Sequence, residues 1–279
     1  MAPNNTNAAE DTPGAGETQL EIMIDEERFQ DKSAGPIQRL VHQNSEESQT
    51  GTPPDDFIIP LETPTLDASG KVTRSFVENL IEFYRQEKRL PTLTIHKILK
   101  DAKELFQSEP SLVDIELGRD DVVNICGDIH GQFFDLANIF EIFGKVSEQN
   151  RYLFNGDFVD RGVWSLEVVM VLFSLKLLNP KSIYLTRGNH ECEQVNHLYG
   201  FENEVLDKYD SRTFRLIQKA FNWLPIAHCV NGSVLVMHGG LPAKEGVTLD
   251  DIRDIKRGKQ PERNSIMIDL LWADPQVKI

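Results

Sequence analysis

The chain has 279 residues, 40% of them hydrophobic, which is enough for one sizeable domain plus a tail. Its formal net charge of −15 argues against a nucleic-acid backbone or an anionic membrane surface as a partner, so we expect no nucleic-acid and no membrane partner. No apolar stretch approaches a membrane span, no signal-peptide core is present and the three cysteines form no CxxC pair, so we expect a cytoplasmic or nuclear protein.

The first segment of the chain has the composition of a disordered tail. Residues 1–70 are rich in Asn, Thr, Pro, Gly, Asp and Glu and show little apolar periodicity, so they cannot bury enough apolar surface to offset the entropy of ordering. Residues 57–61 form a short apolar island within it. We interpret this island as a strand-like arm on the domain surface, with a partner-docking motif as the alternative. The folded domain is expected over residues 71–279.

Two helices are predicted at the start of this domain. Apolar residues recur at three- and four-residue spacing over 72–84 and again over 95–106, which is typical of helices that pack on a core. The Leu-Pro-Thr segment at 90–92 separates the two, and Thr94 is a candidate N-cap for the second.

After Pro110 the pattern alternates between strand and helix. Asn231-Gly232 between two apolar runs predicts a hairpin. The predicted strands are 122–126, 152–154, 183–185, 226–230 and 234–237, and the predicted helices are 133–143, 165–178, about 194–207 and 211–222. This order predicts an α/β fold with functional loops at strand ends.

Four short polar strings each follow an apolar run: Gly-Asp-Ile-His-Gly at 127–131, Gly-Asp-Phe-Val-Asp-Arg-Gly at 156–162, Arg-Gly-Asn-His-Glu at 187–191 and His-Gly-Gly at 238–240. Asp128 and His130 are two residues apart, so both can face one cation. Carboxylate, imidazole and amide oxygen gathered at one place are the ligand set of a two-metal hydrolase.

The second and third strings supply further chemistry. Two adjacent divalent ions repel each other, and Asp157 is our candidate for the anionic bridge between them. The planar fork of Arg161 matches phosphate oxygens, the alternative being a surface arginine paired with Asp160. His190 could protonate a leaving alkoxide if Asp160 held its other ring nitrogen. Arg187 could contact phosphate or brace the site, and both readings stay open.

The remaining histidines are not expected to be metal ligands or catalytic residues. His42, His96, His197 and His228 lie outside any glycine-flanked strand end, and we interpret each as a surface or core residue. Cys126 and Cys229, inside apolar runs, are interpreted as small core residues.

Together, the four strings resemble the serine/threonine protein phosphatases of the metallophosphoesterase family. Glu191 and the full string at 156–162 favour this family over the related dinucleotide-polyphosphate hydrolases. Four further segments resemble the phosphatase 5 branch of the family, and they lie at 195–202, 221–225, 247–253 and 269–276. The resemblance covers about residues 72–276.

This resemblance implies a β-sandwich flanked by helices and two metal ions, with Mn, Fe or Zn as the expected elements. Asp128, His130 and Asp157 would hold the first ion. Asp157, Asn189 and His238 would hold the second.

The resemblance also implies the reaction, which is hydrolysis of phosphoserine and phosphothreonine in proteins by a metal-activated hydroxide. Arg161 and Asn189 would bind phosphate. His190, oriented by Asp160, would be the general acid. Phosphoprotein substrates and regulatory protein partners are expected.

Two departures from the family qualify these expectations. The phosphatase 5 branch carries tetratricopeptide repeats before its catalytic domain, where this chain has a short acidic segment. The family also continues beyond the Asp-Pro-Gln at 274–276 with another histidine ligand, another arginine and further strands. We therefore expect a C-terminally truncated domain whose second metal lacks one ligand, with a weakly active or inactive regulatory form as the alternative.

Overall fold

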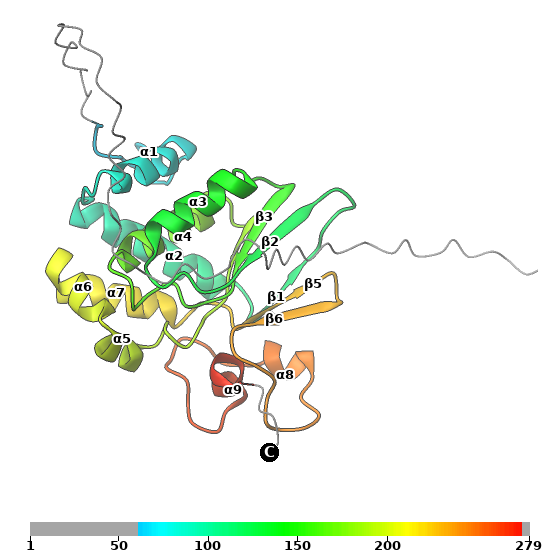
Figure 1. Cartoon of the computed structure of the whole chain (residues 1–279). Coiled ribbons are helices and arrows are strands. Elements are labelled where there is room, and N and C mark those ends of the chain that lie inside the picture. The colour runs from blue at the N-terminus through cyan, green and yellow to red at the C-terminus, as the bar shows by residue number, and fades with distance from the viewer. Residues whose placement is uncertain (1–60, 275–279) are drawn as a thin grey trace, which may run out of the picture. The chain divides into compact units, whose positions relative to one another are not determined.

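The computed structural model describes residues 61–274 of the chain. Figure 1 shows helices on both sides of two small sheets. The helices are α1 (Arg74–Arg85), α2 (Thr92–Ser108), α3 (Phe133–Phe143), α4 (Ser165–Leu178), α5 (Glu193–Tyr199), α6 (Phe201–Lys208), α7 (Ser211–Phe221), α8 (Leu249–Arg253) and α9 (Ile266–Trp272). The strands are β1 (Leu112–Ile115), β2 (Val122–Cys126), β3 (Asn150–Phe154), β4 (Ile183–Leu185), β5 (Ala227–Val230) and β6 (Val234–Met237).

Each sheet has three strands. In the first, β2, β3 and β4 run parallel in that order, and Phe154 pairs with both Cys126 and Leu185. In the second, β1 pairs parallel with β5, and β5 pairs antiparallel with β6. Because the parallel strands of the first sheet end in register, the loops that follow them start at the same edge.

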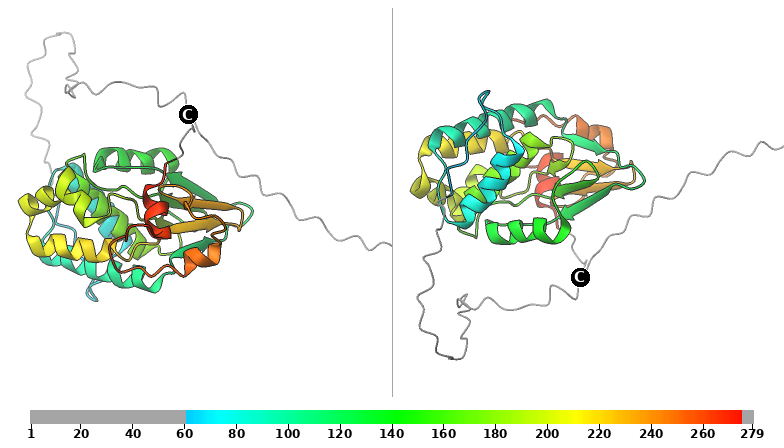
Figure 2. Two further views of the ribbon diagram at one scale, coloured as in Figure 1. Left: turned by 90° about the horizontal axis from the view of Figure 1, so that it is seen from below. Right: turned by 90° about the horizontal axis from the view of Figure 1, so that it is seen from above.

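The two sheets pack against each other as a sandwich. Apolar side chains from both contribute to one buried cluster, among them Ile115 and Val230 of the second sheet and Leu153 and Tyr184 of the first. The larger core lies among the helices, where α4 contacts α1, α2, α3 and α6. Figure 2 shows the sheets between α3 on one side and α2 and α8 on the other. This arrangement confirms the expected helix-flanked β-sandwich.

Most predicted elements form, with a few corrections. The bounds of α3, α4, β2, β4 and β6 agree with the prediction. The single helix expected over 194–207 is two helices, because Gly200 takes a left-handed backbone with φ of +109° between them. Thr94 is not an N-cap, since α2 already begins at Thr92 after Pro91.

Three elements were not predicted, namely β1, α8 and α9. Each is short, so its apolar residues give too few repeats to reveal a period. The tail boundary expected near residue 70 also differs from the structure, because Leu61 and Leu66 already pack against the main core. The rest of the 57–61 island, and His42, lie outside the described residues. Among the helices between residues 61 and 274, none is long and apolar enough to cross a membrane.

Candidate active site

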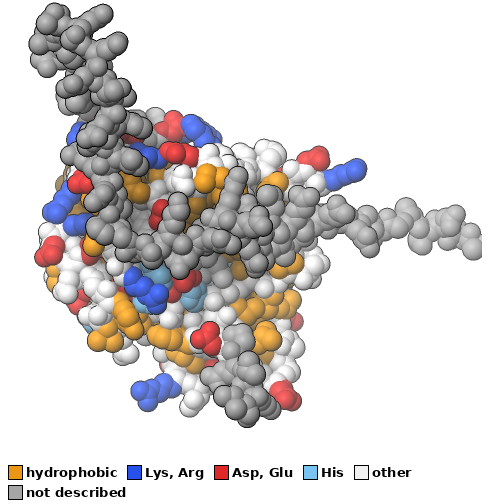
Figure 3. Space-filling model, in the orientation of Figure 1, with side chains coloured by type: hydrophobic (Ala, Val, Ile, Leu, Met, Phe, Trp, Pro, Cys, Tyr) orange, Lys and Arg blue, Asp and Glu red, His pale blue; other side chains and the backbone are white. Residues whose placement is uncertain are grey.

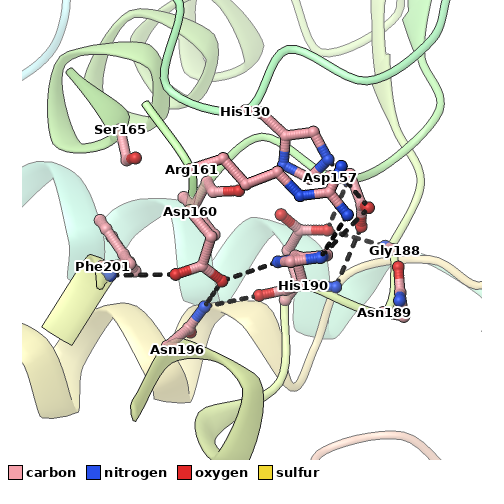
Figure 4. Close-up of polar contacts among 12 residues, drawn as sticks. His130, Asp157, Asp160, Arg161, Ser165, Gly188, Asn189, His190, Asn196 and Phe201 are labelled. Carbon is pink, nitrogen blue, oxygen red and sulfur yellow. Dashed lines mark hydrogen bonds and ion pairs between the residues drawn. The ribbon is translucent and has the colours of Figure 1, made fainter. Parts of the chain in front are cut away.

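The four polar strings converge on one place, although they are far apart in the chain. The loops after β2, β3 and β4 leave the same sheet edge, and the loop after β6 joins them from the second sheet. Asp157 lies buried at the centre of the group (Figure 4). Asp128 and Arg161 are exposed, and Figure 3 shows histidine side chains at the surface beside basic and acidic ones. The site is therefore open to solvent.

Asp157 is shared by two groups of candidate metal ligands. Its Oδ2 lies 3.5 Å from His130 Nε2, and its Oδ1 lies 3.3 Å from His238 Nε2. Within residues 61–274, one potential metal-binding group contains Asp128, Asp157 and His238, and the other contains His130, Asp157 and His190. A carboxylate that turns one oxygen toward each group is placed as a bridge between two cations.

In the neutral form, both His130 and His238 present a lone pair to this centre. His130 Nδ1 donates to the carbonyl of Val159 over 2.8 Å, and His238 Nδ1 donates to the carbonyl of Asn155 over 2.7 Å. His130 Nε2 is then an acceptor, and it has no hydrogen-bond partner among residues 61–274. A buried acceptor that faces the carboxylate oxygens of Asp128 and Asp157 fits a metal cation bound between them.

The side-chain amide of Asn189 completes the set. As oriented, its oxygen lies 2.9 Å from His238 Nε2 and 3.0 Å from each carboxylate oxygen of Asp157. The opposite orientation would let the amide nitrogen donate to the same atoms. The inward oxygen suits a bound cation and the inward nitrogen suits its absence. The orientation with the oxygen inward agrees with the inward-facing Nε2 atoms of His130 and His238.

The charge distribution also favours a cation. Burial lowers the pKa of His238, but the hydrogen bond to Asp157 and the charge of that carboxylate outweigh it and raise the pKa to about 9. Burial raises the pKa of Asp157, yet its interactions with His238 hold the pKa below the usual range. The negative potential that attracts this proton attracts a metal ion equally well.

A second chemical unit lies beside the metal-ligand group. His190 is buried, and its Nδ1 lies 2.8 Å from Asp160 Oδ2. Its Nε2 lies 4.0 Å from Asp157 Oδ2 and 3.5 Å from Arg161 Nη2. The imidazole thus has one nitrogen held by a carboxylate and the other directed into the site. This is the geometry of a proton donor whose tautomer is fixed.

The loops that carry these residues are held together by Glu191. Its Oε2 accepts hydrogen bonds from the backbone N–H groups of Asp157 and Gly188, and its Oε1 accepts one from Phe158, each over 2.8 Å. The carboxylate is fully buried, and burial together with the charge of Asp157 raises the pKa of Glu191. It joins the loop after β3 to the loop after β4.

The backbone of the site is strained. Four of its non-glycine residues have positive φ, and they are His130 (+43°), Asp157 (+52°), Asp160 (+69°) and Arg161 (+65°). Such conformations persist only where surrounding contacts enforce them, and they concentrate at functional sites. The contacts of Glu191 supply part of that enforcement.

The structure thus brings all the predicted site residues together, while their individual roles remain predictions. Arg187 turns away from the centre and is fully buried, where it donates to the carbonyls of Glu191 and Lys259 and to Asn222 Oδ1. It braces the loop, which resolves the alternative that the sequence left open.

The other histidines within the described residues lie away from the site. His96 and His228 are buried and hydrogen-bond to Thr213 and Thr186, respectively, and His197 is exposed and paired with Glu202.

Three buried residues near the site were missed as parts of it. Glu191 was noted only as a mark of the family. Asn196 donates to Asp160 Oδ2, and Gln218 donates to Asn196 Oδ1. The position of Glu191 directly after Asn189 and His190 was a usable signal, whereas Gln218 lies on a helix with an ordinary amphipathic pattern and had none.

Comparison with known proteins gives independent evidence on the family to which the chain belongs. The family model described as calcineurin-like phosphoesterase matches residues 122–279, and one described as the PPP5 TPR repeat region matches residues 39–114. The described part of the second match contains α1 and α2, which pack against α4.

Curated relatives match over most of the chain. It is 50% identical over 207 residues to serine/threonine-protein phosphatase 5 of Homo sapiens, covering 74% of this chain and 42% of the human protein. It is 46% identical over 224 residues to serine/threonine-protein phosphatase T of Schizosaccharomyces pombe, covering 80% and 47%. The chain therefore spans about half the length of these relatives.

A solved structure agrees with the fold. A protein serine/threonine phosphatase from Saccharomyces cerevisiae, described as similar to human phosphatase PP5, superposes with a TM-score of 0.72 at 44% identity. The match covers 73% of this chain and 66% of that chain.

Proposed function

Since the chain belongs to the calcineurin-like phosphoesterase family, we propose that it hydrolyses phosphoserine and phosphothreonine esters in proteins. Membership confirms the resemblance predicted from the ordered polar strings, and the named relatives at 44–50% identity are serine/threonine-protein phosphatases. The chain spans about half the length of those relatives.

We propose that two divalent or trivalent ions, of Mn, Fe or Zn, bind at the shared carboxylate of Asp157. Asp128 and His130 would complete the first site, since His130 Nε2 lies 3.6 Å from Asp128 Oδ2. Asn189 and His238 would complete the second, since His238 Nε2 lies 2.9 Å from Asn189 Oδ1. When bound, such ions acidify water and neutralise charge on phosphoryl oxygens.

The residues around the ions would handle the phosphate group and the leaving group. Arg161 is exposed at the mouth of the site, where its guanidinium can bind two phosphoryl oxygens at once. Protonated His190 would donate from Nε2 to the departing serine or threonine oxygen, while Asp160 holds Nδ1 and stabilises the imidazolium.

One observation carries this proposal: the His190–Asp160 pair lies beside a carboxylate that serves two ligand groups. An alkoxide is a poor leaving group and needs a proton as it departs, whereas a good leaving group does not. A fixed proton donor next to a two-cation site therefore favours phosphate esters of aliphatic alcohols. The open position of the site lets a protein segment reach it.

The test is turnover of a phosphoserine peptide by the purified chain with added Mn²⁺. We expect phosphate release that disappears in Asp157→Asn and persists in His197→Gln, a matched change at an exposed histidine outside the site. Metal and peptide binding without turnover in the unmodified chain would overturn the proposal. That result would indicate instead the regulatory or binding form that the sequence raised as the alternative.

A further inference from the structure

We propose that Asn196 and Gln218 are positioning residues for the proton donor His190, acting through Asp160. The inference rests on the proposed function of the site, because it assigns a role in protonating the leaving group. Within residues 61–274, neither side chain hydrogen-bonds to the five proposed metal ligands, which are Asp128, His130, Asp157, Asn189 and His238. Both are buried, and they come from α5 and α7, outside the four polar strings.

Asn196 contacts both members of the His190–Asp160 pair. Its Nδ2 donates to Asp160 Oδ2 over 2.7 Å and to the backbone carbonyl of His190 over 2.7 Å (Figure 4). One amide group therefore fixes the carboxylate and the backbone that carries the imidazole. His190 Nδ1 donates to Asp160 Oδ2, and with this bond the three groups close a ring of hydrogen bonds.

Gln218 supports the orientation in which the amide nitrogen of Asn196 faces Asp160. Its Nε2 donates to Asn196 Oδ1 over 2.6 Å, so the oxygen of that amide faces α7 and the nitrogen faces Asp160. In the reverse orientation an amide oxygen would face the carboxylate, and two buried acceptors would repel each other. The acceptors Asp160 and His190 hold the nitrogen of the asparagine amide, and the glutamine holds its oxygen.

The other support of Asp160 is the backbone. The N–H of Phe201, the first residue of α6, donates to Asp160 Oδ1 over 2.9 Å. One oxygen is therefore held by a helix N-terminus, and the other is shared between His190 and Asn196. Without the asparagine, the oxygen that orients the imidazole loses its second donor. The carboxylate, still held by the N–H of Phe201, can then rotate and carry the imidazole away from the leaving oxygen.

The experiment compares substrates that differ in how much they need a proton. Asn196→Leu and Gln218→Met remove the donors with little change in volume. We expect Asn196→Leu to lower kcat on a phosphoserine peptide by about 10- to 100-fold, the usual effect of removing an orienting partner. On p-nitrophenyl phosphate kcat should fall by at most about threefold, because that leaving group departs without a proton. Gln218→Met should give the same pattern with a smaller loss.

A matched control separates positioning from stability. Thr213 is also buried on α7 and hydrogen-bonded, but its partners are His96 and Asp210. Thr213→Val should destabilise the fold and affect the two substrates equally. An equal loss on both substrates in Asn196→Leu would overturn the proposal, since a merely structural residue behaves that way.

A double-mutant cycle tests whether Asn196 acts through Asp160. In an Asp160→Asn background, Asn196→Leu should cost little further activity on the phosphoserine peptide, because the carboxylate it orients is already gone. Full additivity of the two losses would contradict the inference.

A second readout needs no turnover. The Nδ1–H proton of His190, bonded to a buried carboxylate, can be followed by NMR and assigned by its loss in His190→Gln. We expect it to shift and to exchange faster with water in Asn196→Leu and Gln218→Met. An unchanged signal would overturn the inference. If the unmodified chain turns over neither substrate, the proposed function fails while this measurement still decides the positioning role.

Discussion

At the scale of single residues, the site depends on a buried carboxylate, Glu191, and a glycine, Gly188, which take no part in the proposed reaction. Glu191 holds three backbone N–H groups, two of them from Asp157 and Phe158, and thereby enforces the positive φ of Asp157. Gly188 gives that carboxylate room, because a Cβ there would lie 2.3 Å from Asp157 Oδ1 and 2.5 Å from its backbone nitrogen. The bridging position of Asp157 is a property of its neighbours as much as of its own side chain.

The first prediction concerns Glu191. Glu191→Gln turns one acceptor into a donor that faces backbone N–H groups, so the loop after β3 should shift. We expect Mn²⁺ to bind about 10- to 100-fold more weakly, as when other supporting groups of metal sites are lost. Calorimetric titration measures this directly. Glu148→Gln, at an exposed glutamate, is the control and should leave the affinity unchanged. Equal affinities in the two variants would show that Glu191 does not shape the site.

The second prediction contrasts two glycines in the polar strings. Gly188→Ala should abolish tight metal binding, since the added methyl group would displace Asp157. Gly127→Ala should change little, because a Cβ at Gly127 meets nothing within 4 Å and its φ is not positive. Metal stoichiometry of the two purified variants checks this. A Gly188→Ala protein that retains both ions would contradict the packing argument.

At the scale of elements, the parallel sheet does the assembly. The register that pairs Phe154 with both Cys126 and Leu185 places three loop origins side by side, and the hairpin of β5 and β6 brings His238 from the other sheet. The two sheets are also joined by a buried hydrogen bond, since Thr186 follows β4 and its hydroxyl group lies 3.0 Å from His228 Nδ1 on β5.

This inter-sheet bond gives a pH prediction. Burial, with a smaller contribution from the charge of Lys176, lowers the pKa of His228 from 6.5 to about 3. The unfolded chain therefore binds a proton that the folded chain does not, and folding free energy is lost as pH falls from the unfolded pKa toward the folded one. Between about pH 7.5 and about pH 5, this histidine should cost about 2 kcal/mol of stability.

Urea unfolding at the two pH values measures the effect. His228→Gln should lose less stability on acidification than the unmodified chain, whereas His197→Gln, at an exposed position, should behave like the unmodified chain. If all three lose stability equally, His228 is not the group responsible.

At the scale of the whole molecule, the ligand groups make folding and metal binding interdependent. Asp157, His130 and His238 are held close together with their ligand atoms facing inward, so a cation bound there would stabilise the folded chain over the unfolded one.

The last prediction is therefore a metal-dependent melting temperature. Excess Mn²⁺ at about 100 times its Kd should stabilise the fold by about 2.7 kcal/mol, which for a domain of this size raises Tm by about 5–10 °C. A chelator should reverse the rise, and Asp157→Asn should not show it. A similar rise in Asp157→Asn would place the stabilising ion elsewhere. Calorimetric melting with and without the metal distinguishes these results.

The local pattern of the sequence was enough for the main elements and for the metal-ligand residue types. The 3.6-residue period of α3 and α4 and the apolar runs of β2 and β4 are encoded within each segment. Strings such as Gly-Asp-Phe-Val-Asp-Arg-Gly carry their own turn geometry, so their place at strand ends followed from the chain alone. Short elements such as β1 and the break at Gly200 escaped because their signal spans too few residues.

What only the tertiary structure decided is how distant side chains pair. The direction of Arg187, the support that Glu191 gives to Asp157, and the path from Gln218 through Asn196 to Asp160 all depend on contacts between segments that are separate in the chain. The sequence by itself determined which residues could form a metal site, because local backbone preference and residue chemistry are properties of each segment. Tertiary packing decided which groups hold them in place, because a buried hydrogen bond is specified by the geometry of both partners.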